Sequence, residues 1–401
     1  MRIIMFAGKG GVGKTSIASA TGVRTAEDGQ KTLIMSLDIA HSLSDIFALD
    51  KGLMEKNKGM PVKMEDRLWI QELDIQEEIQ RNWGEVYKYI VSIFNATGFD
   101  EILAEELAIL PGMEEVSSLL YINRYAQEGD FDVIILDCAP TGESLRFISI
   151  PTTLEWYIRK VFKMERRVVS YIRPVARRFY DVPLPEDDYF GALENLFARL
   201  EGIDKILTDP TITTVRLVTN PEKIVLKETQ RTFLYFSLYK MCIDAIVMNR
   251  ILPGHLTEKY FEDWKKSQRT YLKLAEEYFN PVPIFPVNLF QNEPLGKENL
   301  RRIGAEIYGE HSPTQHFYTE RPYEFHQEDG QFFIRIKLPF LTKEEVELNR
   351  LAEEIVIRIG GFKRHILLPR HVNAYKHVRA KIDGGFLNII FGGKKDGKEK
   401  A

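Results

Sequence analysis

A glycine-rich loop near the amino terminus limits the folds that this chain can adopt. Ile3–Ala7 has the composition of a buried strand, and residues 8–15 then read GKGGVGKT, which fits the pattern G-x-x-x-x-G-K-[ST] before a helix-like stretch. Glycines let successive backbone N–H groups face one anion, and the start of the helix adds its dipole. The sequence therefore predicts a P-loop α/β fold with a phosphate site.

The side chains of this loop suggest how a nucleotide would be held. We expect Lys14 to reach the β- and γ-phosphates and the Thr15 hydroxyl to ligate Mg²⁺. Asp38 and Asp137 each follow a predicted strand, at the edge where ligands bind in open α/β sheets. The residues predicted to contact the nucleotide in this segment are Gly8, Lys9, Gly10, Gly11, Val12, Gly13, Lys14, Thr15 and Ser16.

Apolar, β-branched runs alternate with helix-like segments over residues 1–308. This alternation predicts a doubly wound, mostly parallel sheet with helices on both faces. Two long helical insertions, at about 75–128 and 151–208, interrupt it. The predicted strands are Ile3–Ala7, Thr32–Ser36, Phe131–Leu136, Thr213–Val218, Ile243–Met248 and Pro283–Val287.

The character of the sequence changes after residue 308. Residues 309–320 read as a linker, and residues 321–393 contain about six short strands separated by glycine turns, which predicts a small all-β sandwich. Phe332, Ile334, Ile336 and Leu338 alternate with more polar neighbours and should share the buried face. Residues 394–401 form a charged tail.

Composition excludes several classes of function. With 54 Lys+Arg against 58 Asp+Glu and a net charge of −4, the chain has no whole-protein field for nucleic acid, and we expect no nucleic-acid partner. The 2 cysteines, Cys138 and Cys242, form no CxxC pair, so neither a zinc site nor a disulfide framework is expected. No stretch approaches the ~20 uncharged residues of a membrane-spanning helix, and a cytoplasmic location is the simplest interpretation.

Two further segments of the sequence, read together with the glycine-rich loop, resemble the motifs of a known family. Residues 36–42 read SLDIAHS and residues 137–146 read DCAPTGESLR. Together with the loop, they resemble switch I and switch II of the arsenite-pump ATPases and the tail-anchored-protein targeting ATPases, over about residues 1–308. The resemblance implies a homodimeric ATPase that uses ATP and Mg²⁺, in the cytoplasm or in the stroma of a plastid.

The resemblance implies roles for individual residues. Asp38 would polarise the attacking water, and Asp137 would hold Mg²⁺ through water. Lys9, the additional lysine of the deviant Walker A class, would cross a dimer interface to the partner's nucleotide, as an arginine finger does. Thr141 and Gly142 would move with nucleotide state.

Other segments match parts of the family sequence that bind the nucleotide or connect the nucleotide site to the client-binding helices. Asn249 matches the asparagine that reads adenine in this family, and Phe285, Pro286 and Val287 fall where the family has its adenine-side loop. Thr219-Asn220-Pro221-Glu222 also resembles a family segment. Pro111-Gly112-Met113-Glu114-Glu115 matches the element that links client-binding helices to the nucleotide site.

The chain also departs from the family pattern. Ile39 replaces the proline of switch I, and Glu143 replaces the common histidine of switch II. The zinc-binding CxxC that joins dimers of the eukaryotic targeting ATPases is absent. These departures leave switch stiffness, signal transmission and the dimer interface open.

In the targeting ATPases the corresponding helices form a hydrophobic groove, which implies a transmembrane segment, an amphipathic helix or a lipid as client. Apolar residues recur at helical spacing from Ile75 through Trp83 and Ile90 to Ile93, and Val161–Val168 and Met113 lie in comparable positions. An ordinary buried face is the alternative for each stripe. A basic run over 159–178 suggests either contact with anionic headgroups or a solvated face.

Residues 321–393 resemble an α-crystallin (small heat-shock protein) domain, and an ATPase followed by such a domain is similar to a variant branch of the targeting family in photosynthetic lineages. Two other functions stay open. One is the driving subunit of an arsenite pump, which would need reactive thiols, whereas Cys138 and Cys242 are expected to be buried hydrophobes. The other is a nucleotide-switched scaffold that does not hydrolyse ATP.

Overall fold

The structure is a computed structural model of the 401-residue chain. It describes residues 1–38, 42–49, 56–158, 162, 164–169, 171–172, 183–328, 331–351, 354–368, 372, 375 and 377–392. The switch I residues Ile39 and His41, most of the basic run at 159–178, and the tail lie outside these residues.

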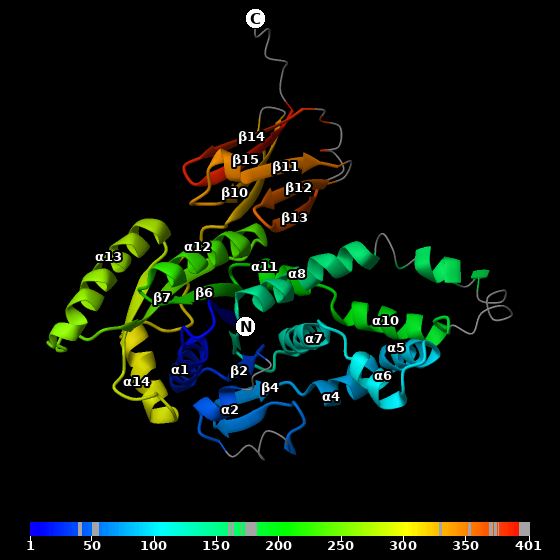
Figure 1. The fold of residues 1–401 in the computed structure, drawn as a ribbon, viewed down its shortest axis with the longest axis horizontal. Helices are drawn as coiled ribbons and strands as arrows, with labels where there is room; N and C mark the ends of the chain where they lie inside the picture. The colour runs from blue at the N-terminus through cyan, green and yellow to red at the C-terminus, as the bar shows by residue number, and fades with distance from the viewer. Residues whose placement is uncertain are drawn as a thin grey trace, which may run out of the picture.

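One large sheet forms the centre of the molecule (Figure 1). Its eight strands follow the order β3-β4-β2-β5-β1-β6-β7-β8 and are parallel except for β3, which runs antiparallel to β4 at one edge. All six predicted strands are present; β3 and β4 were not predicted. The strands are β1 (Arg2–Ala7), β2 (Thr32–Ser36), β3 (Val62–Glu65), β4 (Leu68–Glu72), β5 (Val133–Asp137), β6 (Thr213–Thr219), β7 (Ile243–Ile251) and β8 (Ile284–Asn288).

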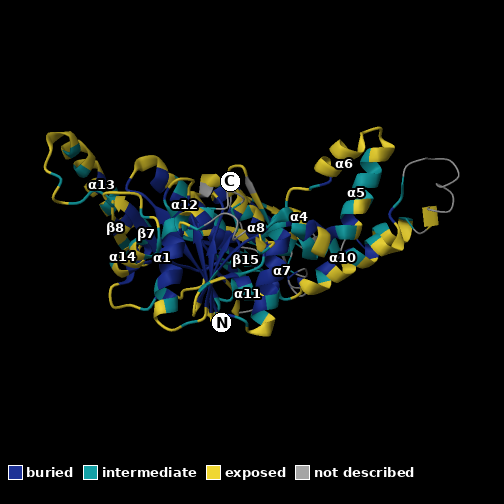
Figure 2. Ribbon diagram, turned by 90° about the horizontal axis from the view of Figure 1, so that it is seen from below, coloured by how far each residue is buried: buried dark blue, intermediate teal, exposed yellow. Residues whose placement is uncertain are grey.

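Helices cover both faces of this sheet, as Figure 2 shows by the buried strands between them. Along β1, Ile3 and Met5 face one core and Ile4 and Phe6 face the other. Strands buried on both faces read as continuous apolar runs. The doubly wound α/β fold is confirmed.

The helices of the ATPase portion lie between the strands in sequence. Those that contribute to the Ile3 core include α7, α12 and α13, whereas α1 and α14 contribute to the Ile4 core. The helices are α1 (Lys14–Glu27), α2 (Ser42–Ile46), α4 (Ile75–Glu78), α5 (Gly84–Ala96), α6 (Glu101–Leu107), α7 (Met113–Glu128), α8 (Thr141–Tyr157), α10 (Asp187–Arg199), α11 (Ile203–Thr208), α12 (Lys223–Leu238), α13 (Glu262–Phe279) and α14 (Lys297–Tyr308).

The first insertion leaves the sheet as a helical arm that carries α5 and α6 (Figure 1). A π-helical turn at Ile79–Trp83 joins α4 to α5. Ile79, Trp83 and Val86 are buried in the main core, and the Trp83 indole donates to Ser117 Oγ of α7 at 3.1 Å. This part of the stripe is therefore core packing, the ordinary buried face that the sequence left as the alternative, and Trp83 does not line an open client groove.

Met113 and Phe162 are buried as well. Met113 begins α7 and packs in the same core. By contrast, Met164 and Val168 are exposed. Of the second predicted apolar region, Phe162 is therefore part of the core, Met164 and Val168 lie on the surface, and Val161 lies outside the described residues.

The carboxyl-terminal unit is a sandwich of a four-stranded and a three-stranded antiparallel sheet, with the orders β14-β15-β10-β9 and β11-β12-β13. The described residues form seven strands where about six were predicted. Phe332, Ile334, Ile336 and Leu338 are buried, as their alternation predicts. The strands are β9 (Tyr323–Glu328), β10 (Gln331–Lys337), β11 (Val346–Arg350), β12 (Glu354–Ile359), β13 (Phe362–Leu367), β14 (Val378–Asp383) and β15 (Phe386–Phe391).

The sandwich sits on α12 and beside α8. Leu234 and Leu238 of α12 are part of the sandwich core. Phe340 of the sandwich packs against Phe233 and Phe279, with ring centroids 6.1 and 6.0 Å apart. These apolar contacts fix the sandwich to two helices of the ATPase portion.

A buried charge cluster at the amino-terminal end of the sheet holds the segment between the two units. Arg216 and Arg2 both pair with Asp244, at 3.3 Å. Arg216 also donates to the carbonyls of Pro313 and Gln315, at 2.7 and 3.2 Å. Residues 309–320, predicted as a linker, therefore include a stretch that is tied to the ATPase portion.

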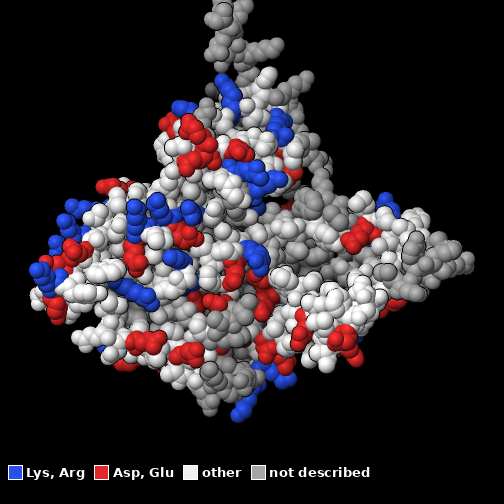
Figure 3. All heavy atoms as spheres, in the orientation of Figure 1, with Lys and Arg blue, Asp and Glu red and all other residues white. Residues whose placement is uncertain are grey.

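Figure 3 shows acidic and basic side chains interspersed over the visible face, in keeping with the small net charge. Of the helices that the structure describes, none has the length and apolar character needed to cross a membrane.

Candidate functional site

The glycine-rich loop joins β1 to α1, as the sequence predicts. Gly8 and Gly13 have φ values of 156° and 93°. A Cβ atom would come within 2.3 Å of the Val218 carbonyl oxygen at Gly8 and within 2.4 Å of the Asn249 amide nitrogen at Gly13. Both contacts are shorter than any side chain permits, so the loop packs closely enough to require glycine at these positions.

Lys14 lies folded over the loop. Its side chain is 7% exposed, and its Nζ donates to the Lys9 carbonyl at 3.3 Å. The next residue, Thr15, places its hydroxyl 3.2 Å from Ser42 Oγ at the start of α2. Lys9 itself is exposed. The ammonium and hydroxyl groups expected to contact phosphate and Mg²⁺ are thus both held at the loop.

Asp137 ends β5 at the carboxyl edge of the sheet and is 1% exposed. Neither carboxylate oxygen makes a hydrogen bond with the residues that the structure describes. Burial raises the pKa of this carboxyl group to about 7, although Thr15 and Lys14 counteract part of the shift. A buried carboxylate without a donor, beside a threonine hydroxyl, has the chemistry of a group that serves a hydrated Mg²⁺ ion. The residues present therefore fit the metal that the loop implies.

Asp38 follows β2 beside Asp137. Its backbone N–H donates to Ser36 Oγ at 3.1 Å, and the adjacent Leu37 N–H donates to the Asp137 carbonyl at 2.8 Å. The structure therefore brings the start of switch I and the end of β5 together.

Switch II continues from Asp137 into α8. Ser144 Oγ donates to the Ala139 carbonyl at 2.5 Å, and Thr232 of α12 donates to the Thr141 hydroxyl at 3.4 Å. Gly142 and Glu143 are exposed. The first turn of α8 is thus linked to α12, which carries the sandwich.

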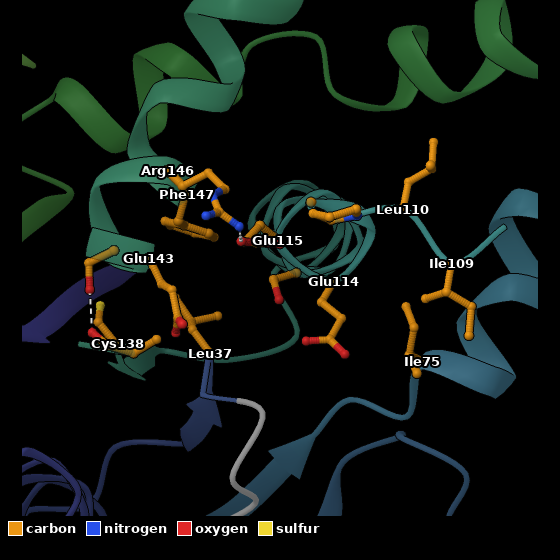
Figure 4. Close-up of a pocket in the computed structure, with 15 residues that line it drawn as sticks. Leu37, Ile75, Ile109, Leu110, Glu114, Glu115, Cys138, Glu143, Arg146 and Phe147 are labelled. Atoms are coloured by element: carbon orange, nitrogen blue, oxygen red, sulfur yellow. Dashed lines mark hydrogen bonds and ion pairs between the residues drawn. The ribbon is translucent and has the colours of Figure 1, made fainter. Parts of the chain in front are cut away.

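A cavity of about 290 Å³ separates switch II from the start of α7 (Figure 4). Leu37 and Glu143 line it from the nucleotide side, and Leu110, just before α7, and Glu114, in the first turn of α7, line it from the opposite side. Arg146 of α8 and Glu115 of α7 approach within 3.8 Å. The predicted coupling element at 111–115 therefore lies directly against switch II.

Asn249 lies at the loop and is largely buried. Its amide nitrogen donates to the Val12 carbonyl at 2.8 Å, and its amide oxygen accepts from the Arg250 N–H at 2.9 Å. One N–H and one lone pair stay available for a base. Pro286 is exposed, whereas the Val287 side chain is buried in the core, which leaves only its main chain for contact with a ligand.

The two thiols are buried and apart. Burial raises the pKa of Cys138 well above its usual range and that of Cys242 to about 12. Cys138 follows β5 at the carboxyl edge of the sheet, whereas Cys242 precedes β7 at the opposite edge, three strands away, or roughly 14 Å. They cannot share one metalloid ion, and the described residues contain no other cysteine.

Sequence reasoning missed Glu72, a buried acid in the same region. It ends β4 and accepts hydrogen bonds from Leu43 N–H at 2.8 Å and Ser44 N–H at 3.2 Å. The apolar run Leu68–Ile70 ahead of it is a weak strand signal that could have drawn attention to this glutamate. Among the described residues, no group of three or more His, Cys, Asp or Glu side chains could hold a metal ion alone.

Comparison with known proteins agrees with this geometry. The family model described as "Anion-transporting ATPase" matches residues 1–309, and the model described as "HSP20-like domain found in ArsA" matches residues 329–391. The chain belongs to the anion-transporting ATPase family. Members of this family are ATPases, and the second match agrees with the α-crystallin-like sandwich.

The relatives extend over most of the chain. "Putative arsenical pump-driving ATPase 1" of Aquifex aeolicus is 49% identical over 96% of this chain and 98% of its own. "Putative arsenical pump-driving ATPase" of Chlorobaculum tepidum is 36% identical over 99% of this chain and 98% of its own. "ATPase GET3" of Candida glabrata is 28% identical over 78% of this chain and 91% of its own.

Proposed function

We propose that the ATPase is a homodimeric switch in which Mg-ATP binding and hydrolysis open and close an apolar surface for a hydrophobic client. The observation that carries the proposal is the 290 Å³ cavity, where switch II faces the first turn of α7 and thus the base of the helical arm. A movement of switch II at this position changes the packing of the arm directly.

In the proposed site, Lys14 and the loop N–H groups hold the phosphates, Thr15 ligates Mg²⁺, and Asp137 holds it through water. Bound Mg²⁺ would neutralise charge on the phosphates. Asp38 orients the attacking water. Asn249 and the main chain at Pro286 and Val287 contact the adenine. The exposed Lys9 is free to reach the nucleotide of a second copy, where a cation stabilises the charge of phosphoryl transfer.

The proposed client surface, called the arm surface below, lies on α6 and its flanks. Five large apolar side chains are exposed there, and Ile102 is the most exposed at 74%. Exposed apolar clusters mark interaction sites on folded proteins. The cluster fits a transmembrane segment, an amphipathic helix or a lipid chain. The arm surface comprises Phe99, Ile102, Leu103, Leu107 and Leu110. A separate set of exposed apolar residues lies in the second insertion and comprises Met164, Val168, Tyr171 and Ile172.

We also propose that the basic run at 159–178 contacts a membrane surface. The structure describes two of its basic residues, Arg166 and Arg167. Arg166 is paired with Glu194, and Arg167 also has a partner. The arsenite alternative left open by the sequence, which the names of two relatives also carry, is disfavoured because the two thiols are far apart and burial raises their pKa values.

ATP turnover tests the site. Lys14→Ala should reduce kcat at least about 100-fold because it removes the cation at the phosphates.

Lys9→Ala should reduce kcat by about 1,000-fold if this lysine acts in trans, with nucleotide binding by the monomer retained. The measurement is phosphate release as a function of protein concentration: wild-type activity per chain should rise with concentration, and activity independent of concentration would contradict the dimer.

Client binding tests the arm surface. Ile102→Asp should weaken binding of a fluorescent, leucine-rich 20-residue helical peptide at least about 10-fold, because it places a charge in an apolar contact. Basal ATPase activity should be unchanged. Leu351→Asp, at an exposed position in the sandwich, is the matched control and should bind the peptide normally. Peptide cross-links that fall outside residues 75–180 would refute this surface.

A further inference from the structure

Glu72 lies on the strand next to switch I. Ser36, the last residue of β2, is paired with Glu72 on one side and with Asp137 on the other. Two strand spacings, or about 10 Å, therefore separate the backbones of the two acids. Both stand at the carboxyl edge of the sheet, where ligands bind in this class of fold.

The carboxylate of Glu72 is hydrogen-bonded to the backbone of α2. It is 6% exposed, and its Oε1 accepts both the Leu43 and the Ser44 N–H bonds. It forms no ion pair with a residue in the described part of the chain. Hydrogen bonds from backbone N–H to an ionised carboxylate are among the stronger ones in proteins, so this contact fixes where α2 begins.

The start of α2 also contacts the phosphate loop. Ser42, the residue before the first of these N–H groups, lies 3.2 Å from the hydroxyl of Thr15. Switch I is thus attached at both ends: Ser36 and Asp137 hold Leu37 and Asp38 at its start, and Glu72 holds Leu43 and Ser44 at its end.

From these contacts we infer that Glu72 is a positioning residue for ATP hydrolysis. It holds α2 so that Ser42 stays against Thr15, the residue proposed to ligate Mg²⁺. It does not touch the nucleotide. In the proposed site the loop itself holds the phosphates, so the contribution of Glu72 falls on turnover and on Mg²⁺ use rather than on nucleotide affinity. The inference rests on the ATPase reaction proposed for this site.

The test separates positioning from simple stabilisation. In Glu72→Ala, kcat should fall about 10-fold to 100-fold because misplacement of a catalytic segment by about 1 Å has effects of that size. The KM for ATP should change less than about threefold, and the Mg²⁺ concentration that gives half-maximal activity should rise. Glu72→Gln keeps an oxygen acceptor for both N–H groups and should recover most of kcat.

A second buried glutamate provides the matched control. Glu78 lies in α4 and accepts from the Tyr121 hydroxyl at 2.7 Å, and its other hydrogen bonds come from Arg81 and Asn82 rather than from α2 or the phosphate loop. Glu78→Gln should lower the melting temperature without changing kcat or the Mg²⁺ dependence. If Glu72→Ala melts lower but retains wild-type kcat per folded molecule, Glu72 is only structural and the inference is wrong. An inactive wild-type protein would instead refute the proposed function.

Discussion

Asp137→Asn is expected to stabilise the nucleotide-free protein and to abolish its ATPase activity. The carboxyl group is buried, its oxygens lack donors among the described residues, and its pKa is raised to about 7. Ionisation of such a group opposes folding, whereas a neutral amide avoids that penalty. The same substitution removes the charge that would serve Mg²⁺, and kcat should fall at least about 100-fold.

The sign of the pH dependence follows from the raised pKa. Because the folded protein retains this proton up to about pH 7 while the unfolded chain releases it near its ordinary pKa of 3.8, wild-type stability declines between those values as pH rises. The advantage of Asp137→Asn should therefore grow by roughly 2–3 kcal/mol between pH 5 and pH 8.

Urea unfolding of the nucleotide-free protein at several pH values, without Mg²⁺, measures this difference. Asp66→Asn is the control, because that carboxylate is 95% exposed and should show no such trend. An Asp137→Asn variant that is less stable than wild type at pH 8, or equally active, would contradict the account of this carboxylate.

Among the substitutions proposed here, Asp244→Ala is expected to cause the largest loss of folding stability. It leaves Arg216, which is fully buried, and Arg2 without their shared carboxylate. An unpaired buried charge destabilises by about 3–5 kcal/mol, a large fraction of the stability of a typical domain. The carbonyl contacts from Arg216 to residues 313 and 315 should loosen as well, which frees the segment before the sandwich.

Thermal unfolding and limited proteolysis measure these effects. The melting temperature of the ATPase portion should fall by roughly 10 °C, and cleavage within residues 309–320 should accelerate. Glu347→Ala breaks the exposed pair with Arg358 at 3.7 Å and should change stability by less than about 1 kcal/mol. If Asp244→Ala and Glu347→Ala lowered stability equally, burial of the Asp244 cluster would not contribute to the stability of the protein.

Much of the fold is predictable from local sequence. The six predicted strands are rich in apolar and β-branched residues, and the sandwich strand at 331–337 alternates, so composition and period suffice there. β4 escapes prediction because its sequence LWIQE ends in two polar residues, both buried in the structure. Gln71 is satisfied by the Gly59 carbonyl and the Tyr125 hydroxyl, which are distant in sequence.

The residues of the candidate site also fall into those that local sequence predicts and those that it does not. The phosphate loop is local, and its motif places Lys14 and Thr15 without knowledge of the fold. Glu72 contacts α2 from a neighbouring strand, and no spacing in the sequence signals that contact. Periodicity also cannot separate a buried apolar face from an exposed one, which explains why Trp83 proves to be core whereas Ile102 is exposed.

Calorimetric titration of ATP into the protein, with and without Mg²⁺, tests the central claim most directly. We expect saturable binding at the phosphate loop that Mg²⁺ strengthens and that Lys14→Ala removes while the variant retains its wild-type circular dichroism spectrum. Binding of equal strength in the Lys14→Ala variant, or no heat of binding in folded wild-type protein with Mg²⁺ present, would contradict it.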